Sequence, residues 1–202
     1  MTARGYVDPG TNREPGATSL PRHVQVLLDF TNSVDRELGT DELTTPRELS
    51  HWLHGHGLLP RRVRATAADL DLALALRRGL HAAFVATHDG TGGTGGTGDL
   101  AAAAADLPLR LTTGRQGPVL APVQTGVPGG LSQLLVAVNA AQADGTWQRL
   151  KVCSADFCAW AYLDTTKNRS KAYCEWGCGN RIKTRNYRAR KKQDPAAASS
   201  PT

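Results

Sequence analysis

The spacing of four cysteines is the feature that most constrains this chain. Cys153, Cys158, Cys174 and Cys178 form two close pairs, with four residues inside the first pair, three inside the second and fifteen between the pairs. Thiolates in two such pairs are typical of a chain that encloses one tetrahedral Zn²⁺ ion. A four-cysteine site leaves no coordination position for a water nucleophile. The spacing therefore predicts one structural zinc ion and favours a protein that is not an enzyme.

Two disulfides are the alternative use of the same cysteines, and four cysteines allow three connectivities. The residues that follow Met1 lead into no apolar stretch, so we expect no secretory signal. We therefore expect a cytoplasmic location, where a reducing environment disfavours stable disulfides. Neither pair has the C-x-x-C spacing of redox proteins. Zinc is the favoured interpretation.

A basic segment follows the last cysteine directly. Between Gly179 and Lys192 the chain has seven basic residues and no acidic residue. A charge run is most often a solvated face, but this one abuts the predicted metal site and lacks acidic partners, which favours a helix presented to a polyanion. The candidate nucleic-acid-binding residues are Asn180, Arg181, Lys183, Arg185, Arg188, Arg190, Lys191 and Lys192. At helical spacing, Ile182, Asn186 and Ala189 share another face, which we expect to pack against the rest of the finger.

Charge is divided unevenly along the chain. Residues 151–202 carry eleven basic and four acidic residues, a net charge of +7, whereas residues 1–150 carry thirteen basic and fourteen acidic residues. This asymmetry indicates a nearly neutral domain joined to a nucleic-acid-binding one. We expect double-stranded DNA as the partner; RNA binding and a zinc-stabilised protein-interaction module are the alternatives. No run of eighteen apolar residues exists, so we expect no membrane span.

The first three quarters of the chain read as mainly helical. Apolar periodicity and start and stop signals predict helices over residues 22–38, 46–54, 67–88, 99–107 and 131–144. Thr45 and Glu48 form a capping box in front of the second helix, and Thr66 with Asp69 caps the third. Two short apolar runs, separated by residues 114–117, predict a β-hairpin. The Gly/Thr-rich residues 89–98 read as a flexible loop.

The cysteine-rich segment predicts a treble-clef-like finger made of a knuckle, a hairpin and a helix. Residues 151–153 and 160–163 read as two short strands beside the first cysteine pair. Cys174 and Cys178 stand four residues apart, so on a helix both thiolates point the same way. We therefore expect both at the start of the final, basic helix, where the positive end of the helix dipole favours thiolate.

The segment from Tyr173 through Cys178-Gly-Asn-Arg181 to Arg185 resembles the CGNR zinc finger, a module of bacterial proteins associated with transcription regulation. The resemblance extends back through Arg149-Leu-Lys-Val-Cys153 and forward to Arg190. It implies that the four cysteines bind zinc and that the module binds DNA. The spacing between the last two cysteines is one residue shorter than in many members.

The region before the finger resembles the ABATE domain, which commonly precedes a CGNR finger. The resemblance rests on the order of its helices, from Leu28-Asp-Phe-Thr-Asn32 to Ala143-Asp-Gly-Thr-Trp147. We expect a disordered arm over residues 1–21, a helical domain over 22–148, the finger over 149–192 and a disordered tail over 193–202. The helical domain is larger than anchoring a finger requires. We therefore expect it to bind a small effector or a second copy of itself, and a passive spacer is the alternative.

Overall fold

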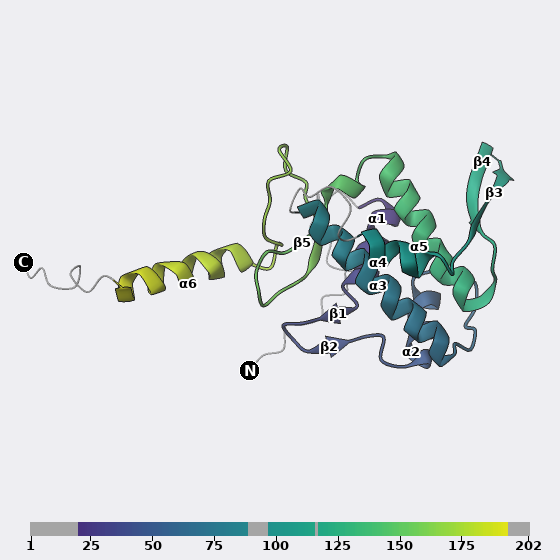
Figure 1. Cartoon of the computed structure of the whole chain (residues 1–202), viewed down its shortest axis with the longest axis horizontal. Coiled ribbons are helices and arrows are strands. Elements are labelled where there is room, and N and C mark those ends of the chain that lie inside the picture. The colour runs from purple at the N-terminus through teal and green to yellow at the C-terminus, as the bar shows by residue number, and fades with distance from the viewer. Residues whose placement is uncertain (1–19, 89–96, 116, 194–202) are drawn as a thin grey trace, which may run out of the picture.

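The computed structural model describes residues 20–88, 97–115 and 117–193. Most of the predicted N-terminal arm, residues 89–96 of the predicted Gly/Thr loop and nearly all of the predicted tail lie outside these residues. The described part contains six α-helices and three two-stranded antiparallel hairpins, which confirms a mainly α fold with a small finger (Figure 1). In chain order these elements are α1 (Arg22–Thr31), β1 (Val34–Asp35), β2 (Thr40–Asp41), α2 (Pro46–Gly55), α3 (Ala67–His88), α4 (Thr97–Ala104), β3 (Leu109–Gly114), β4 (Gly117–Pro122), α5 (Gly126–Ala143), β5 (Leu150–Val152), β6 (Ala161–Leu163) and α6 (Cys178–Gln193).

Helix α3 is the central element of the helical body. It packs against α4 along one side and also contacts α1, α2, α5 and β5, while α1 and α5 pack against each other. Aliphatic side chains from these helices fill the core, with Phe30 and Phe84 among its largest fully buried members. Two aromatic contacts brace it: Phe30 meets Trp52 edge-on with ring centres 5.3 Å apart, and Phe84 meets Trp147 in the same manner at 5.4 Å. The second contact ties the segment just before β5 to α3.

The predicted start signals of α2 and α3 are confirmed. Thr45 Oγ1 accepts a hydrogen bond from the Glu48 amide at 3.3 Å, and Glu48 Oε2 accepts one from the Thr45 amide at 2.8 Å. Thr66 and Asp69 make the same reciprocal pair at 3.2 and 2.8 Å in front of α3. Each pair satisfies amides that the first helical turn leaves without an intrahelical acceptor.

The predicted helix over residues 22–38 is wrong at its C-terminal end. Helix α1 stops at Thr31, and the chain then forms the short β1–β2 hairpin. Asp35 Oδ1 accepts hydrogen bonds from the amides of Glu37 and Leu38 at 2.8 and 3.0 Å. An aspartate that captures amides in this way offers the backbone an alternative to the helix. Leu38, the last residue of the predicted helix, is 47% exposed.

The buried face of α3 does not include every leucine of the helix. Leu70 and Leu74 are only half-buried. The fully or nearly fully buried positions are Ala73, Leu76, Gly79, Leu80, Ala83 and Phe84. Arg77 is buried among them because both terminal nitrogens of its guanidinium reach Asp41 at 2.7 Å, and Nη1 also donates to Ser33 Oγ at 2.9 Å. This ion pair holds the β1–β2 hairpin onto α3.

Two helices begin earlier than predicted. Helix α4 begins at Thr97 and not at Asp99, and α5 begins at Gly126 and not near Leu131. The first turns of α5 are rich in glycine, which reads as a loop in the sequence. In the fold, a β-carbon at Gly130 would lie 3.1 Å from the side chain of Leu59. The small residue allows the segment after α2 to pack directly onto α5.

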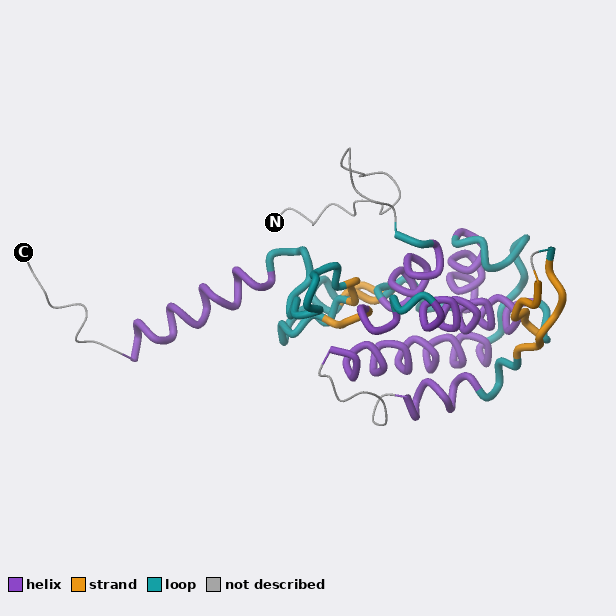
Figure 2. Tube along the Cα trace, turned by 90° about the horizontal axis from the view of Figure 1, so that it is seen from above, coloured by secondary structure: helices purple, strands orange, loops and turns teal. Residues whose placement is uncertain are grey.

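Helix α6 stands away from the helical body. Both views show it projecting from the end of the molecule opposite the β3–β4 hairpin (Figures 1 and 2). Ile182 is buried in the finger, whereas Asn186 and Ala189, which were expected to pack beside it, are exposed. The described part of the chain contains no helix with the length and apolar character that crossing a membrane requires.

Gly79 provides a test of the α3–α4 packing. A β-carbon at this position would lie 2.7 Å from the Leu100 Cα atom and 2.8 Å from its amide nitrogen, both backbone atoms of α4. We predict that Gly79→Ala lowers the free energy of unfolding by about 1–3 kcal/mol, because the two helix backbones must separate. In the control, Gly55→Ala at the end of α2, a β-carbon would meet no atom within 4 Å. Denaturant unfolding measures the stability of both variants. If Gly79→Ala destabilises the protein no more than Gly55→Ala, or stabilises it, the described α3–α4 packing is contradicted.

Candidate metal centre and nucleic-acid interface

The four cysteine sulfurs converge on one point at the base of α6. The Sγ atoms of Cys153, Cys158, Cys174 and Cys178 all lie within 4.8 Å of one another, and all four residues are buried. Two separations are shorter, 3.7 Å between Cys158 and Cys174 and 3.6 Å between Cys174 and Cys178. A tetrahedral ion with Zn–S bonds of about 2.3 Å requires sulfurs about 3.8 Å apart. The donor set and its spacing therefore fit one tetrahedral metal ion.

The cysteines are free thiols, so the structure gives no support to the two-disulfide alternative. In the protein alone, burial raises the pKa of the Cys178 thiol to about 11. The hydrogen bond between Cys158 and Cys174, together with burial, holds the pKa of Cys158 well above its usual range. Four buried thiolates close together repel one another, and a bound cation would offset that repulsion.

The first cysteine pair lies on a tight knuckle. The Cys153 amide donates to the Trp160 carbonyl at 2.9 Å, and the Cys158 amide donates to Ala155 at 3.0 Å, so the chain folds back between the two cysteines. Ala159 completes the turn with a φ of 56°. Strands β5 and β6 lead into and out of this knuckle as an antiparallel pair, which confirms the predicted finger hairpin.

The prediction that both later cysteines start the final helix is wrong. Helix α6 begins at Cys178, and Cys174 lies before it on a turn. Gly177 stands between them with a φ of 75°, a left-handed conformation that a helix cannot contain. The turn still brings the two sulfurs within 3.6 Å, and the Cys174 amide points at Cys153 Sγ at 3.5 Å. The cysteines meet through a glycine turn and not through helical spacing.

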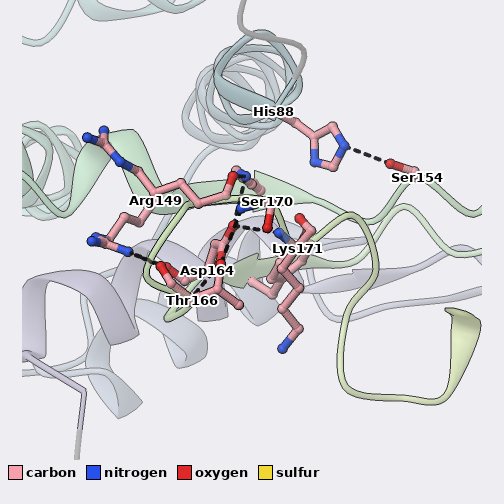
Figure 3. A network of polar contacts seen from close by, with 10 residues as sticks. His88, Arg149, Ser154, Asp164, Thr166, Ser170 and Lys171 are labelled. Carbon is pink, nitrogen blue, oxygen red and sulfur yellow. Dashed lines mark hydrogen bonds and ion pairs between the residues drawn. The ribbon is translucent and has the colours of Figure 1, made fainter.

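A buried ion pair supports the loop that connects the two cysteine pairs. Figure 3 shows Asp164 beside Thr166 and Lys171. Asp164 is fully buried, and its Oδ2 atom lies 2.8 Å from Lys151 Nζ. Oδ1 accepts from the amide and hydroxyl of Thr166 at 2.9 and 2.6 Å, and Oδ2 accepts from the Lys171 amide at 3.0 Å. Burial opposes ionisation of Asp164, but these hydrogen bonds outweigh it and hold the carboxyl pKa well below its usual range. Lys151 also donates to the Arg169 carbonyl. One carboxylate thus orders residues 164–171.

The finger is joined to the helical body through the same hairpin. Asn32, directly after α1, donates from Nδ2 to the Ala161 carbonyl at 2.9 Å and accepts from the Ala161 amide at 2.7 Å. Its side chain therefore pairs with β6 as a neighbouring strand would. Leu150, Val152 and Ala161 belong to the core of the helical body, so apolar packing continues across the predicted domain boundary. The finger is thereby held in one orientation relative to α1 and α3.

The predicted nucleic-acid-binding residues all lie on α6, and their side chains are exposed. Arg181, Arg185, Arg188 and Lys192 line one shallow groove with Asn180 and Thr184 along one flank of the helix. Two of these arginines already have acidic partners: Arg181 meets Glu37 at 2.7 Å, and Arg185 meets Asp156 at 2.9 Å. The remaining basic residues of α6 form no ion pair with the described part of the chain. The sequence pattern did not indicate the two pairings, since Glu37 lies 144 positions from Arg181.

Sequence reasoning missed the roles of Lys151, Asp164 and Asn32. Lys151 and Asp164 appear in the sequence as an ordinary strand lysine and a loop aspartate, and only their burial identifies them as a pair. The two residues are thirteen positions apart, which is no regular spacing of a helix or a strand. Within the described residues, the cysteines form the one cluster of this kind suited to a metal, and His51, His54 and His56 do not form another.

We predict that breaking the buried Lys151–Asp164 ion pair strongly lowers the free energy of unfolding. Asp164→Asn leaves the Lys151 ammonium buried without its carboxylate, and breaking such a pair costs about 3–5 kcal/mol. Glu175→Gln is the matched control, because Glu175 pairs with Lys171 on the surface and is 81% exposed. That control should change the free energy of unfolding by less than about 1 kcal/mol. Denaturant titration of the metal-loaded proteins measures both; equal small effects would show that the Asp164 network does not support the finger.

Comparison with known protein families agrees with this geometry. Residues 149–191 match the CGNR zinc finger family. Residues 25–147, more than half of the chain, match the ABATE family, which is described as "Putative stress-induced transcription regulator". A search of curated proteins finds no match. The chain therefore belongs to the ABATE family and carries a CGNR zinc finger after the ABATE domain.

Proposed function

We propose that this protein is a cytoplasmic, zinc-dependent transcriptional regulator that binds double-stranded DNA through α6. The observation that carries the proposal is a projecting helix with seven exposed basic side chains, no acidic residue and a four-cysteine centre at its base. Phosphate contacts supply most of the affinity of such a surface. The family description, which refers to transcription regulation, supports the same conclusion. We propose no enzymatic activity.

The distribution of side chains around α6 suits the major groove of duplex DNA. With about 3.6 residues per turn, one flank of the helix carries Arg181, Arg185, Arg188 and Lys192. The opposite flank carries Lys183, Tyr187 and Arg190. Asn180, Thr184 and Lys191 lie on the edge between the two flanks. A helix in the major groove has phosphates on both sides and base edges in front of it. We propose that the two flanks contact phosphates and that Asn180 and Thr184 face the bases.

The bound zinc ion would supply charge compensation and a cross-link between four chain positions. The residues of the chain position the four cysteines and the start of α6. The knuckle holds Cys153 and Cys158, the Gly177 turn brings Cys174 back to Cys178, and Ile182 fixes the first turns of α6 against the finger. Residues 183–192 of α6 are exposed, so the position of the basic helix depends mainly on this short base.

Binding to single-stranded nucleic acid is the second candidate, because two aromatic side chains near the basic surface are exposed. Trp176, just before α6, is 48% exposed, and Tyr187 on α6 is 59% exposed. Bases of single strands stack on such rings. A preference for single-stranded RNA over duplex DNA at equal salt concentration would favour this candidate.

We also propose that the helical body binds a small effector or a second copy of itself. One groove, of about 1420 Å³, lies where α2 and α3 begin. Its lining includes Arg47, Arg62 and Arg64, and the lining carboxylate of Glu48 is already hydrogen-bonded to Thr44 and Thr45. Exposed guanidinium groups favour an anionic effector.

The metal centre predicts one zinc ion per chain. Elemental analysis of the purified full chain should find one equivalent of zinc. Cys174→Ser should lose most of it and loosen the finger, because a structural zinc site contributes on the order of 10 kcal/mol to the folding of a small module. Ser154→Ala, which lies between the first two cysteines and removes no sulfur, is the control and should retain the metal. A full chain without zinc, or with two disulfides, would disprove the proposed centre.

The basic helix predicts a salt-dependent affinity for DNA. The logarithm of the binding constant should fall by about 0.9 per logarithmic unit of salt for each phosphate neutralised. Arg188→Ala with Lys192→Ala removes two charges from α6 and should reduce this slope by about 1.8.

The control for this experiment is Arg61→Ala with Arg110→Ala, which makes the same change in net charge at exposed positions of the helical body. Fluorescence anisotropy of a labelled duplex, measured over a range of salt concentrations, compares the two pairs. An equal loss in both would show that binding follows net charge and not the α6 surface.

A further inference from the structure

Two carboxylates lie against the first turns of α6 and occupy its arginines nearest the body. Arg181 Nη1 donates to Glu37 Oε1 at 2.7 Å, and its guanidinium lies over the Phe157 ring, 4.1 Å from the ring centre. Arg185 Nη1 donates to both carboxylate oxygens of Asp156, at 3.0 and 2.9 Å. These are the contacts that guanidinium groups make with phosphates. The first turns of one flank of α6 are therefore already engaged within the protein.

The two carboxylates come from different parts of the chain. Asp156 lies on the knuckle of the finger, between the first two cysteines. Glu37 lies in the helical body, on the turn between β1 and β2. That turn is held by the Asp35 carboxylate, which accepts the Glu37 amide, and by the Arg77–Asp41 ion pair, which attaches β2 to α3. Glu37 is 20% exposed and is presented to α6 from a fixed support.

We propose that Glu37 is an intramolecular substitute for a nucleic-acid phosphate, which withholds Arg181 from the DNA and lets the helical body regulate the affinity of α6. This inference rests on the proposed function. Asp156 acts on Arg185 in the same way, but from within the finger. Nucleic acid must exchange these two carboxylates for its phosphates before the whole flank can contact the backbone.

The Arg181–Glu37 ion pair is weak enough to reduce DNA binding without abolishing it. Arg181 is 47% exposed and solvent reaches the pair, so it is a weak, exchangeable ion pair. The other five basic residues of α6 have no ion pair within the described residues and can bind phosphate at once. Coupling between two sites is reciprocal, so binding of DNA to Arg181 would also loosen the hold of α6 on the β1–β2 turn. A ligand or partner that moves this turn would change the affinity for DNA.

The test compares two glutamate variants of the zinc-loaded full chain. Glu37→Gln removes the carboxylate that pairs with Arg181. Glu175→Gln removes the same charge from the finger, but the native Glu175 pairs with Lys171 and not with α6. Anisotropy of a fluorescein-labelled DNA duplex should show Glu37→Gln binding about two- to fivefold more tightly than Glu175→Gln. Its salt slope should also be steeper by about 0.9, the value for one added phosphate contact.

A second pair of measurements tests whether the effect of Glu37→Gln acts through Arg181. In an Arg181→Gln background, Glu37→Gln should have no effect beyond that of Glu175→Gln, because the group it frees is gone. The inference would be overturned if the Glu37→Gln protein bound the DNA duplex no more tightly than the Glu175→Gln protein. Weaker binding by the Glu37→Gln protein would show that Glu37 positions Arg181 for DNA. These outcomes differ from failure of the proposed function, in which the unmodified protein itself binds no duplex at low salt.

Discussion

The convergence of four cysteine sulfurs at the base of α6 is the constraint on which the proposed interface depends. The side chains of residues 183–192 are exposed, so in the described structure the direction of the helix depends on this base and on the surface ion pairs of Arg181 and Arg185. A sixteen-residue helix with seven like charges is weakly stable by itself in water, because its charges repel at neighbouring turns. A cation at the sulfurs would anchor one end of the helix, and phosphates along its flanks would relieve the repulsion. The metal at the base and nucleic acid along the flanks would thus stabilise the same helix.

The anchor is itself fixed to the helical body. Asn32 pairs with Ala161 through both ends of its amide, and Leu150 and Val152 enter the core beside α3. Asp164 then orders the loop that returns the chain to the second cysteine pair. These contacts make a continuous connection from the helical body through the finger hairpin to α6. A domain that only carried the finger on a flexible linker would not need them.

The sequence predicted the parts that depend on local chemistry. The capping residues Thr45 and Thr66, the helical class and the grouping of the cysteines all follow from residue type and spacing. The errors arise where tertiary contacts decide. Helix α1 ends early because Asp35 captures backbone amides, and Gly177 separates Cys174 from the helix by a left-handed turn. The partners of Arg181 and Lys151 lie far along the chain or at irregular spacing, and no local pattern could identify them.

We propose that α6, held by the zinc-loaded finger, is the nucleic-acid interface. Chemical-shift mapping of the zinc-loaded full chain during titration with duplex DNA is the decisive measurement. We expect shifts concentrated in the amides of residues 178–193, with a smaller group at the β1–β2 turn around Glu37. Shifts confined to the helical body, with the α6 amides unchanged at saturating DNA, would contradict this proposal.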